Sequence, residues 1–163
     1  MTESSLKLPA VGLLRIDHVG VAVADLDAAI EFYEHAFGMR CVHRETNAEQ
    51  GVREAMLAVG DDPAGGRVQL LAPIGPDSPI ARFLDRNGPG VQQVAYTVAD
   101  VDATCAALRD RGLRLLYETP RRGTAGSRIN FVHPKDAGGV LVELVEPAAR
   151  PNDAEGAMRT TLG

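Results

Sequence analysis

The sequence predicts an α+β protein built from two tandem βαβββ modules, whose strands form a curved half-barrel sheet around a metal site. Three observations predict this architecture. The chain contains an internal repeat, each repeat begins with an alternating strand pattern, and a helical apolar stripe follows directly.

The repeat is visible when the run IDHVGVAVADLDAAIEFY is laid on VQQVAYTVADVDATCAAL, which starts 75 residues later. At this offset His18 falls on Gln93, and Val23–Asp25 falls on the identical run Val98–Asp100. A further match, between GVR and GSR later in each half, keeps the same offset. Separated matches at one offset indicate two copies of one unit rather than chance similarity.

Each copy is predicted to start with a strand, at 16–23 and 91–98, and to continue with an amphipathic helix. In these strands large apolar residues alternate with small or polar ones. One face can therefore pack on the helix while the other lines a cavity. The helical stripes are Leu26, Ile30, Tyr33 and Phe37 in the first copy, and Val101, Cys105 and Leu108 in the second.

Capping residues mark the helix ends, and three short strands follow each helix. The candidate caps are Asp25 or Asp27 and Asp100 or Asp102 at the starts, and Gly38 and Gly112 at the ends. The further strands are expected near 39–45, 52–59 and 66–72, and near 113–118, 128–133 and 139–145.

The domain organisation follows from the repeat. A single domain is expected over 13–147, with module one at 14–74, a linking helix at 78–86 that starts at Ser78-Pro79, and module two at 90–147. Residues 1–12 and 148–163 are polar, contain proline and lack periodicity, so we expect flexible tails there.

Composition excludes several classes of protein. The 163 residues carry a formal net charge of −5, which argues against nucleic-acid partners. No apolar run approaches the ~18 residues that a membrane span needs, and the first ten residues lack a signal pattern. We therefore expect a soluble cytoplasmic protein without membrane partners. The isolated cysteines, Cys41 and Cys105, cannot form a zinc site by themselves.

Four polar positions are expected to meet in the cavity. His18 and Gln93 are equivalent by the repeat, and Gln69 and Glu143 are equivalent at an offset of 74. Each alone also fits a surface-facing strand residue or a hydrogen-bonded core residue, although an inward carboxylate is costly unless it is paired or metal-bound. One imidazole, one carboxylate and two amides together favour six-coordinate Co²⁺, Mn²⁺, Ni²⁺ or Mg²⁺ over structural zinc.

Glu54 is a candidate general base. It shares a strand face with Val52 and Met56, so it points inward if they do. A carboxyl group in an apolar cavity beside a metal can act as a general base. A solvated glutamate, or an ion pair with Arg53, fits the pattern equally well.

A family resemblance rests on the two aligned runs above together with NAEQGVREAML, VQLLAP, GSRINFVHPKD and GGVLVELVEP. These runs resemble the methylmalonyl-CoA epimerase family of the vicinal-oxygen-chelate superfamily, to which glyoxalase I and extradiol dioxygenases also belong. The resemblance covers roughly residues 14–147, and it is most specific in the second half.

The resemblance implies the vicinal-oxygen-chelate fold, a homodimer and a metal-dependent isomerase acting on methylmalonyl-CoA. A divalent metal, first of all Co²⁺ with Mn²⁺, Ni²⁺, Mg²⁺ or Zn²⁺ as alternatives, would be held by His18, Gln69, Gln93 and Glu143. Glu54 and Glu143 would remove and return the C2 proton through a metal-stabilised enolate. The chain departs from the family at Gln92-Gln93, where a His-His pair is usual.

Ser127, Arg128 and Lys135 are candidate substrate-binding residues for the CoA thioester, although a solvated basic loop also fits the pattern. Three other functions remain open: a glyoxalase-type lyase, a ring-cleaving dioxygenase, and a non-enzymatic small-molecule-binding protein of the same fold. A lyase would carry glutamate in place of Gln69. A dioxygenase would need a second histidine where the chain has Gln93.

Overall fold

The computed structural model describes residues 10–149, and within this range eight strands form one sheet. In chain order the elements are β1 (Leu13–Ala22), α1 (Leu26–Phe37), β2 (Arg40–Asn47), β3 (Val52–Ala58), β4 (Arg67–Pro73), α2 (Pro79–Asn87), β5 (Gly90–Val98), α3 (Val101–Asp110), β6 (Arg121–Arg122), β7 (Arg128–Val132) and β8 (Leu141–Glu146). Two short 3₁₀ helices, η1 (Thr124–Gly126) and η2 (Pro134–Asp136), flank β7.

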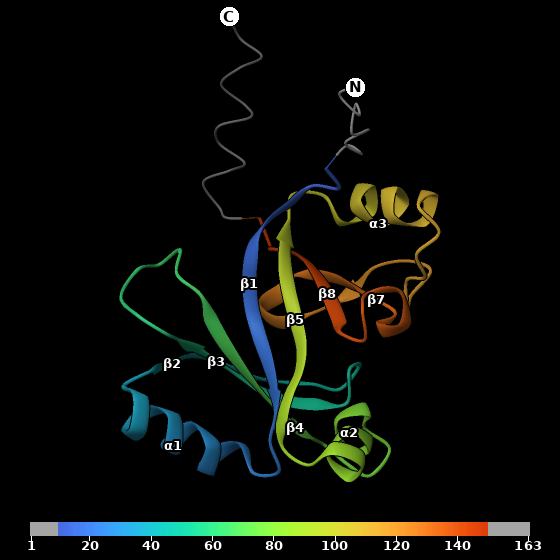
Figure 1. The fold of residues 1–163 in the computed structure, drawn as a ribbon. Helices are drawn as coiled ribbons and strands as arrows, with labels where there is room; N and C mark the ends of the chain where they lie inside the picture. The colour runs from blue at the N-terminus through green and yellow to red at the C-terminus, as the bar shows by residue number, and fades with distance from the viewer. Residues whose placement is uncertain (1–9, 150–163) are drawn as a thin grey trace, which may run out of the picture.

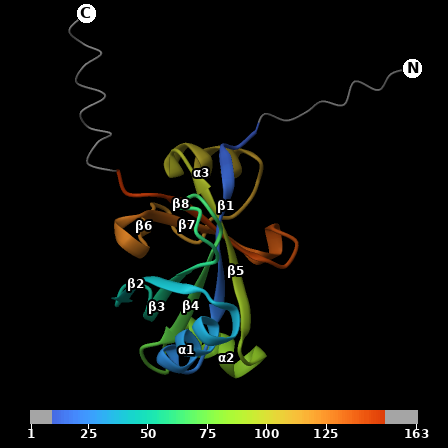
Figure 2. The ribbon, with the colours of Figure 1, turned by 90° about the vertical axis from the view of Figure 1, so that its left-hand side faces the viewer.

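The sheet is a curled half-barrel in which the two modules meet at the centre (Figure 1). The strand order is β2-β3-β4-β1-β5-β8-β7-β6, so the first strand of each module lies in the middle. β1 pairs antiparallel with β5, whereas each of them pairs parallel with the last strand of its own module, β4 or β8. Figure 2 shows the same central pair from the side, with α1 and α2 at one end and α3 at the other. The predicted α+β half-barrel is confirmed.

The helix starts form as the sequence predicts. The side chain of Asp25 accepts a hydrogen bond from the backbone N–H of Ala28, and Asp100 does the same for Ala103. Helix α1 ends at Gly38, whose φ of 67° lies in the left-handed region that glycine tolerates. The predicted linking helix is also present, as α2 with Ser78 as its N-cap.

The predicted apolar stripe of α1 is wrong at its end. Leu26 and Ile30 are buried against the sheet, and Tyr33 packs on the same cluster. Phe37, however, is 62% exposed. It lies in the last helical turn, beyond the residues that contact the sheet, and its ring lies against those of its aromatic neighbours Phe32 and Tyr33.

The predicted strand at 113–118 is also wrong. This segment makes only an isolated bridge, between Leu115 and Val132, and the strand of this region is the short β6. The side chain of Asn130 explains the difference. Its Oδ1 accepts from the N–H of Tyr117 at 3.1 Å and its Nδ2 donates to the carbonyl of Tyr117 at 2.9 Å. Arg114 and Leu116 still form backbone hydrogen bonds with His133 and Phe131, so the buried side chain takes the place of ladder bonds from Tyr117 onward.

The predicted tails lie almost entirely outside the described residues. No helix within residues 10–149 is both long and apolar enough to span a bilayer.

Candidate active site

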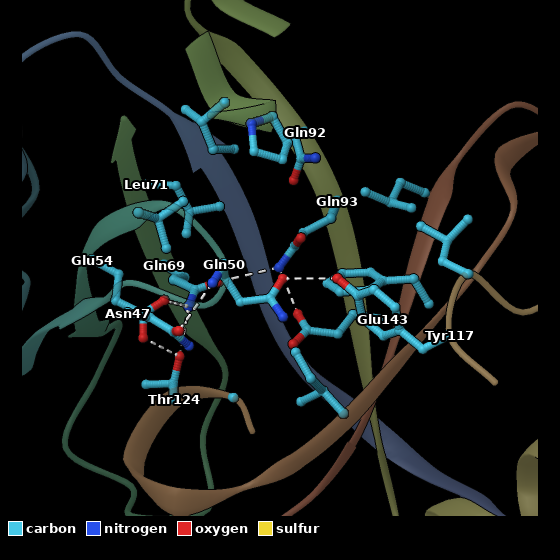
Figure 3. Close-up of a pocket in the computed structure, with 18 residues that line it drawn as sticks. Asn47, Gln50, Glu54, Gln69, Leu71, Gln92, Gln93, Tyr117, Thr124 and Glu143 are labelled. Carbon is cyan, nitrogen blue, oxygen red and sulfur yellow. Dashed lines mark hydrogen bonds between the residues drawn. The ribbon is translucent and has the colours of Figure 1, made fainter. Parts of the chain in front are cut away.

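A cavity of about 130 Å³ lies on the concave side of the sheet, and both modules contribute to its wall. Figure 3 shows its polar side chains pointing toward one another, with Glu54 and Glu143 on opposite sides. The lining residues are Asn47, Gln50, Val52, Glu54, Gln69, Leu71, Pro79, Ile80, Gln92, Gln93, Leu116, Tyr117, Gly123, Thr124, Ile129, Phe131, Leu141 and Glu143.

A chain of hydrogen bonds joins the two buried carboxyl groups across this cavity. Gln69 Nε2 donates to Glu54 Oε2 at 2.9 Å, and Gln69 Oε1 accepts from Gln93 Nε2 at 3.2 Å. Gln93 Nε2 also donates to Glu143 Oε2 at 2.5 Å. The structure therefore brings together residues that the repeat pairs 74 or 75 positions apart in the sequence.

Gln93 reaches this position because the residue opposite it on β1 is glycine. Gly20 pairs with Gln93 in the β1–β5 register. A Cβ on Gly20 would lie 2.5 Å from Gln93 Cγ, which is closer than two such atoms can approach. The small-residue face predicted for β1 therefore makes room for a functional side chain.

His18 is buried on β1 and oriented by Asp17. Asp17 Oδ1 lies 2.8 Å from His18 Nδ1, and His18 Nε2 lies 3.1 Å from Glu143 Oε2. Burial alone would lower the pKa of His18, but the hydrogen bonds to Asp17 and Glu143 raise that pKa to about 9. Thr97 Oγ1 in turn donates to Asp17 Oδ2 at 2.6 Å. A carboxylate behind one ring nitrogen is the arrangement typical of metal-binding histidines.

Glu54 is 4% exposed, so of the two interpretations open from the sequence, the inward-facing one holds. Burial raises the pKa of Glu54 to about 7, and the nearby carboxylates of Glu45 and Glu143 act in the same direction. A carboxyl group that titrates near neutrality is suited to accept and return a proton.

Thr124 and Glu45 surround Glu54 but were not among the predicted site residues. Thr124 Oγ1, on η1 of the other module, donates to Glu54 Oε1 at 2.6 Å. Glu45 faces Glu54 across the β2–β3 pair. Glu45 Oε2 lies 2.5 Å from His43 Nε2 and accepts a hydrogen bond from the backbone N–H of Ala125 at 3.0 Å. No motif marks Thr124, because only the folded loop carries it to the cavity. Glu45 did leave a signal, since antiparallel pairing of the predicted strands at 39–45 and 52–59 brings the end of the first, where Glu45 lies, near the start of the second, where Glu54 lies.

The donor set fits a divalent cation. His18 supplies a nitrogen, Glu143 a carboxylate and Gln69 and Gln93 amide groups, and all four are buried together. Among the described residues no cluster of three or more His, Cys, Asp or Glu side chains could hold a metal. The four residues of the donor set do not form such a cluster, because two of them are glutamines and only His18 and Glu143 are of those types. Such a set suits metals that accept oxygen and imidazole ligands without thiolate.

The predicted substrate-binding residues do not meet at the main cavity. Arg128 is exposed and pairs with Asp102 at 2.9 Å and with Glu146 at 3.4 Å. Lys135 lies in η2 and is not among the residues that line the cavity. Ser127 is buried and lines a neighbouring cavity of about 210 Å³, whose wall also includes His18 and Glu143. Further polar groups at the main cavity are Gln50, Gln92 and Tyr117, which the repeat does not mark.

The fold and the cavity define a class of protein. The model of the glyoxalase/bleomycin resistance protein/dioxygenase superfamily matches residues 17–131. The chain belongs to this superfamily.

Similar proteins within the superfamily identify the family to which the chain belongs. A crystal structure of methylmalonyl-CoA epimerase from Mycobacterium tuberculosis is 58% identical, with a TM-score of 0.81 over 91% of this chain and 97% of that one. A variant of Streptomyces coelicolor methylmalonyl-CoA epimerase in complex with 2-nitronate-propionyl-CoA is 52% identical, with a TM-score of 0.81 over 85% of this chain and 100% of that one. The mitochondrial methylmalonyl-CoA epimerase of Homo sapiens is 37% identical over 131 residues, which are 80% of this chain and 72% of the human protein. Within the superfamily, the chain is a member of the methylmalonyl-CoA epimerase family, whose enzymes are isomerases.

Proposed function

We propose that this protein interconverts (2R)- and (2S)-methylmalonyl-CoA by removing the C2 proton from one face and returning a proton to the other. One observation carries the proposal. Two buried carboxyl groups, Glu54 and Glu143, stand on opposite sides of one cavity and are joined through Gln69 and Gln93. The names of the relatives support the choice of substrate.

The proton transfers follow from the chemistry of the substrate. C2 lies between a thioester and a carboxylate, so its proton is unusually acidic for a C–H group. Glu54 accepts this proton, and the C–H electron pair moves into the thioester carbonyl to give an enolate that is planar at C2. Glu143, which starts this turnover with a proton, then delivers that proton to the opposite face, and the electron pair returns to C2. The substrate gains one proton for the one it loses. Glu54 then gives its proton to solvent and Glu143 takes one up, so the enzyme returns to its starting state.

The residues around the two carboxyl groups prepare them for these roles. Thr124 fixes one oxygen of Glu54 and Gln69 the other, so the carboxylate is held in one orientation. Apolar side chains such as Ile129 and Phe131 form part of the cavity wall beside the two carboxyl groups. Ile129 occupies the position equivalent to Glu54 in the repeat, so the two halves of the site differ chemically.

His18, Gln69, Gln93 and Glu143 are the residues that would hold a divalent cation, with Co²⁺ as the first candidate. When bound, the cation supplies positive charge that stabilises the negative charge developing on the thioester oxygen. The 2-nitronate-propionyl-CoA bound to the Streptomyces relative supports an enolate course, because a nitronate is a planar anion like an enolate.

The proposal is tested by supplying one pure epimer of methylmalonyl-CoA to purified protein loaded with Co²⁺ and following the other epimer with a stereospecific coupled assay. We expect interconversion to a near-equal mixture. A protein that binds the thioester but leaves the pure epimer unchanged would contradict the proposal and favour a non-enzymatic binding protein of the same fold.

A further inference from the structure

Two polar atoms in the cavity have no hydrogen-bond partner, although both are buried. Among the described residues, the buried side-chain polar atoms without a partner are Gln50 Nε2 and Gln92 Oε1. Both residues line the main cavity. Buried polar atoms in folded proteins are nearly always hydrogen-bonded, so these two atoms in one cavity are available to bind a ligand.

A β-bulge aims Gln92 into the cavity. In the β1–β5 register Gly20 pairs with Gln93 and Val21 pairs with Val91, which leaves Gln92 as an extra residue on β5. Adjacent strand residues normally point to opposite faces, but a bulge breaks this alternation. Gln92 and Gln93 therefore both face the cavity, whereas Val91 is 62% exposed.

Gln92 and Gln50 offer complementary hydrogen-bonding groups. Gln50 Oε1 accepts from the hydroxyl of Tyr117 at 3.0 Å, which fixes the amide and leaves its Nε2 as a donor. Gln92 Oε1 is an acceptor. In Figure 3 Gln92 lies beyond Gln93, away from the group formed by Glu54, Gln69 and Thr124.

The chemistry of the ligand decides which part of it meets Gln92. The acyl end of a methylmalonyl thioester carries a carboxylate and a thioester carbonyl, which accept hydrogen bonds and donate none at neutral pH. It can therefore meet the donor of Gln50 but not the acceptor of Gln92. The first donor along a CoA-type thioester is the secondary amide N–H two carbons from the sulfur.

We propose that Gln92 binds this amide N–H, so that the bulge on β5 selects thioesters whose arm carries a secondary amide near the sulfur. This inference rests on the proposed function for the identity of the thioester. Gln50 then faces the acyl oxygens, and the pair sets the direction in which the thioester lies in the cavity.

The test compares two racemic methylmalonyl thioesters, one of N-acetylcysteamine and one of 2-acetoxyethanethiol, in which an ester oxygen replaces the N–H. Calorimetric titration of the wild type should show the amide bound about fivefold more tightly, as one neutral hydrogen bond to a buried acceptor allows. Gln92→Met, which keeps the side-chain length and removes the acceptor, should bring this ratio close to one. Val91→Thr, on the outer face of the same strand, should keep the wild-type ratio.

The proposal would be overturned if the wild type bound the two thioesters equally or bound neither of them. It would also be overturned if Gln92→Met kept the wild-type ratio. Exchange of the C2 proton is recorded separately in the same wild-type samples. Absence of an amide preference with exchange intact contradicts the role of Gln92 alone, whereas an amide preference without exchange contradicts the proposed function alone.

Discussion

The carboxyl group of Glu54 shows how single residues set the chemistry of this cavity. Its pKa is raised because the group is buried and because other carboxylates lie nearby, while Thr124 and Gln69 hold both of its oxygens. The strand alternation predicts a face for Glu54 but not which face is buried. That depends on the curl of the sheet, which is a property of the whole fold.

Glu54→Gln should lower the rate of C2 proton exchange by about 10²- to 10⁴-fold, because the amide keeps the shape of the side chain and cannot accept the proton. Metal binding should remain, since Glu54 is not one of the four residues proposed to hold the cation. Glu49→Gln, an exposed glutamate in the same region, serves as the control and should exchange at the wild-type rate. Wild-type exchange in Glu54→Gln would remove Glu54 from the mechanism.

The raised pKa of Glu54 also predicts a pH dependence. Glu54 must be ionised to accept a proton, and its pKa of about 7 means that it becomes protonated as the pH falls through neutrality. We therefore expect kcat/KM to decrease about tenfold per pH unit on the acid side of this value. A profile measured from pH 5 to 9 that stays flat down to pH 5 would show that the proton acceptor has an ordinary carboxyl pKa.

At the scale of elements, the central strands β1 and β5 position the polar side chains that cross the cavity. Their small residues let long side chains reach from one strand to the next, as Gly20 does for Gln93. The sequence predicted these strands and helix caps well, because period-two alternation and Asp or Ser caps are local signals. It failed at 113–118 because the ladder with β7 stops after Leu116, where the side chain of Asn130 bonds to the backbone of Tyr117 instead. A hydrogen bond between residues so far apart in the sequence leaves no local pattern.

Gly20→Ala should displace Gln93, because the new Cβ would lie 2.5 Å from Gln93 Cγ. We expect a loss of about 1–3 kcal/mol in the free energy of unfolding and weaker Co²⁺ binding, both measured on purified protein. Gly66→Ala is the matched control, since a Cβ added there would have nothing within 4 Å. Unchanged metal binding in Gly20→Ala would mean that Gln93 does not depend on this gap.

At the scale of the whole molecule, the site exists only where the two modules meet. His18 and Gln69 come from module one, and Gln93 and Glu143 come from module two. The repeat predicted this convergence because it makes His18 equivalent to Gln93 and Gln69 equivalent to Glu143. It could not predict Gln92, which needs a bulge, or Thr124, which needs a loop. The implied homodimer and cytoplasmic location stay predictions. A measurement of molecular mass in solution would check whether the protein is a homodimer.

A cation shared by both modules should stabilise the whole fold. At a Co²⁺ concentration of about 100 times its Kd, binding should add about 2.7 kcal/mol, which corresponds to a rise in Tm of roughly 5–10 °C for a chain of this size. Treatment with a chelator should reverse the rise. His18→Ala should lose it, whereas His35→Ala, an exposed histidine on α1, should keep it. An equal rise in both variants would locate the cation elsewhere.

Deuterium uptake at C2 tests the central claim most directly. One pure epimer of methylmalonyl-CoA is incubated with the Co²⁺-loaded protein in D₂O, and the products are separated and examined by NMR. Proton transfer between two carboxyl groups in one cavity predicts that the newly formed epimer carries deuterium at C2. Formation of the opposite epimer with its original C2 hydrogen retained, or no formation of it at all, would contradict the account.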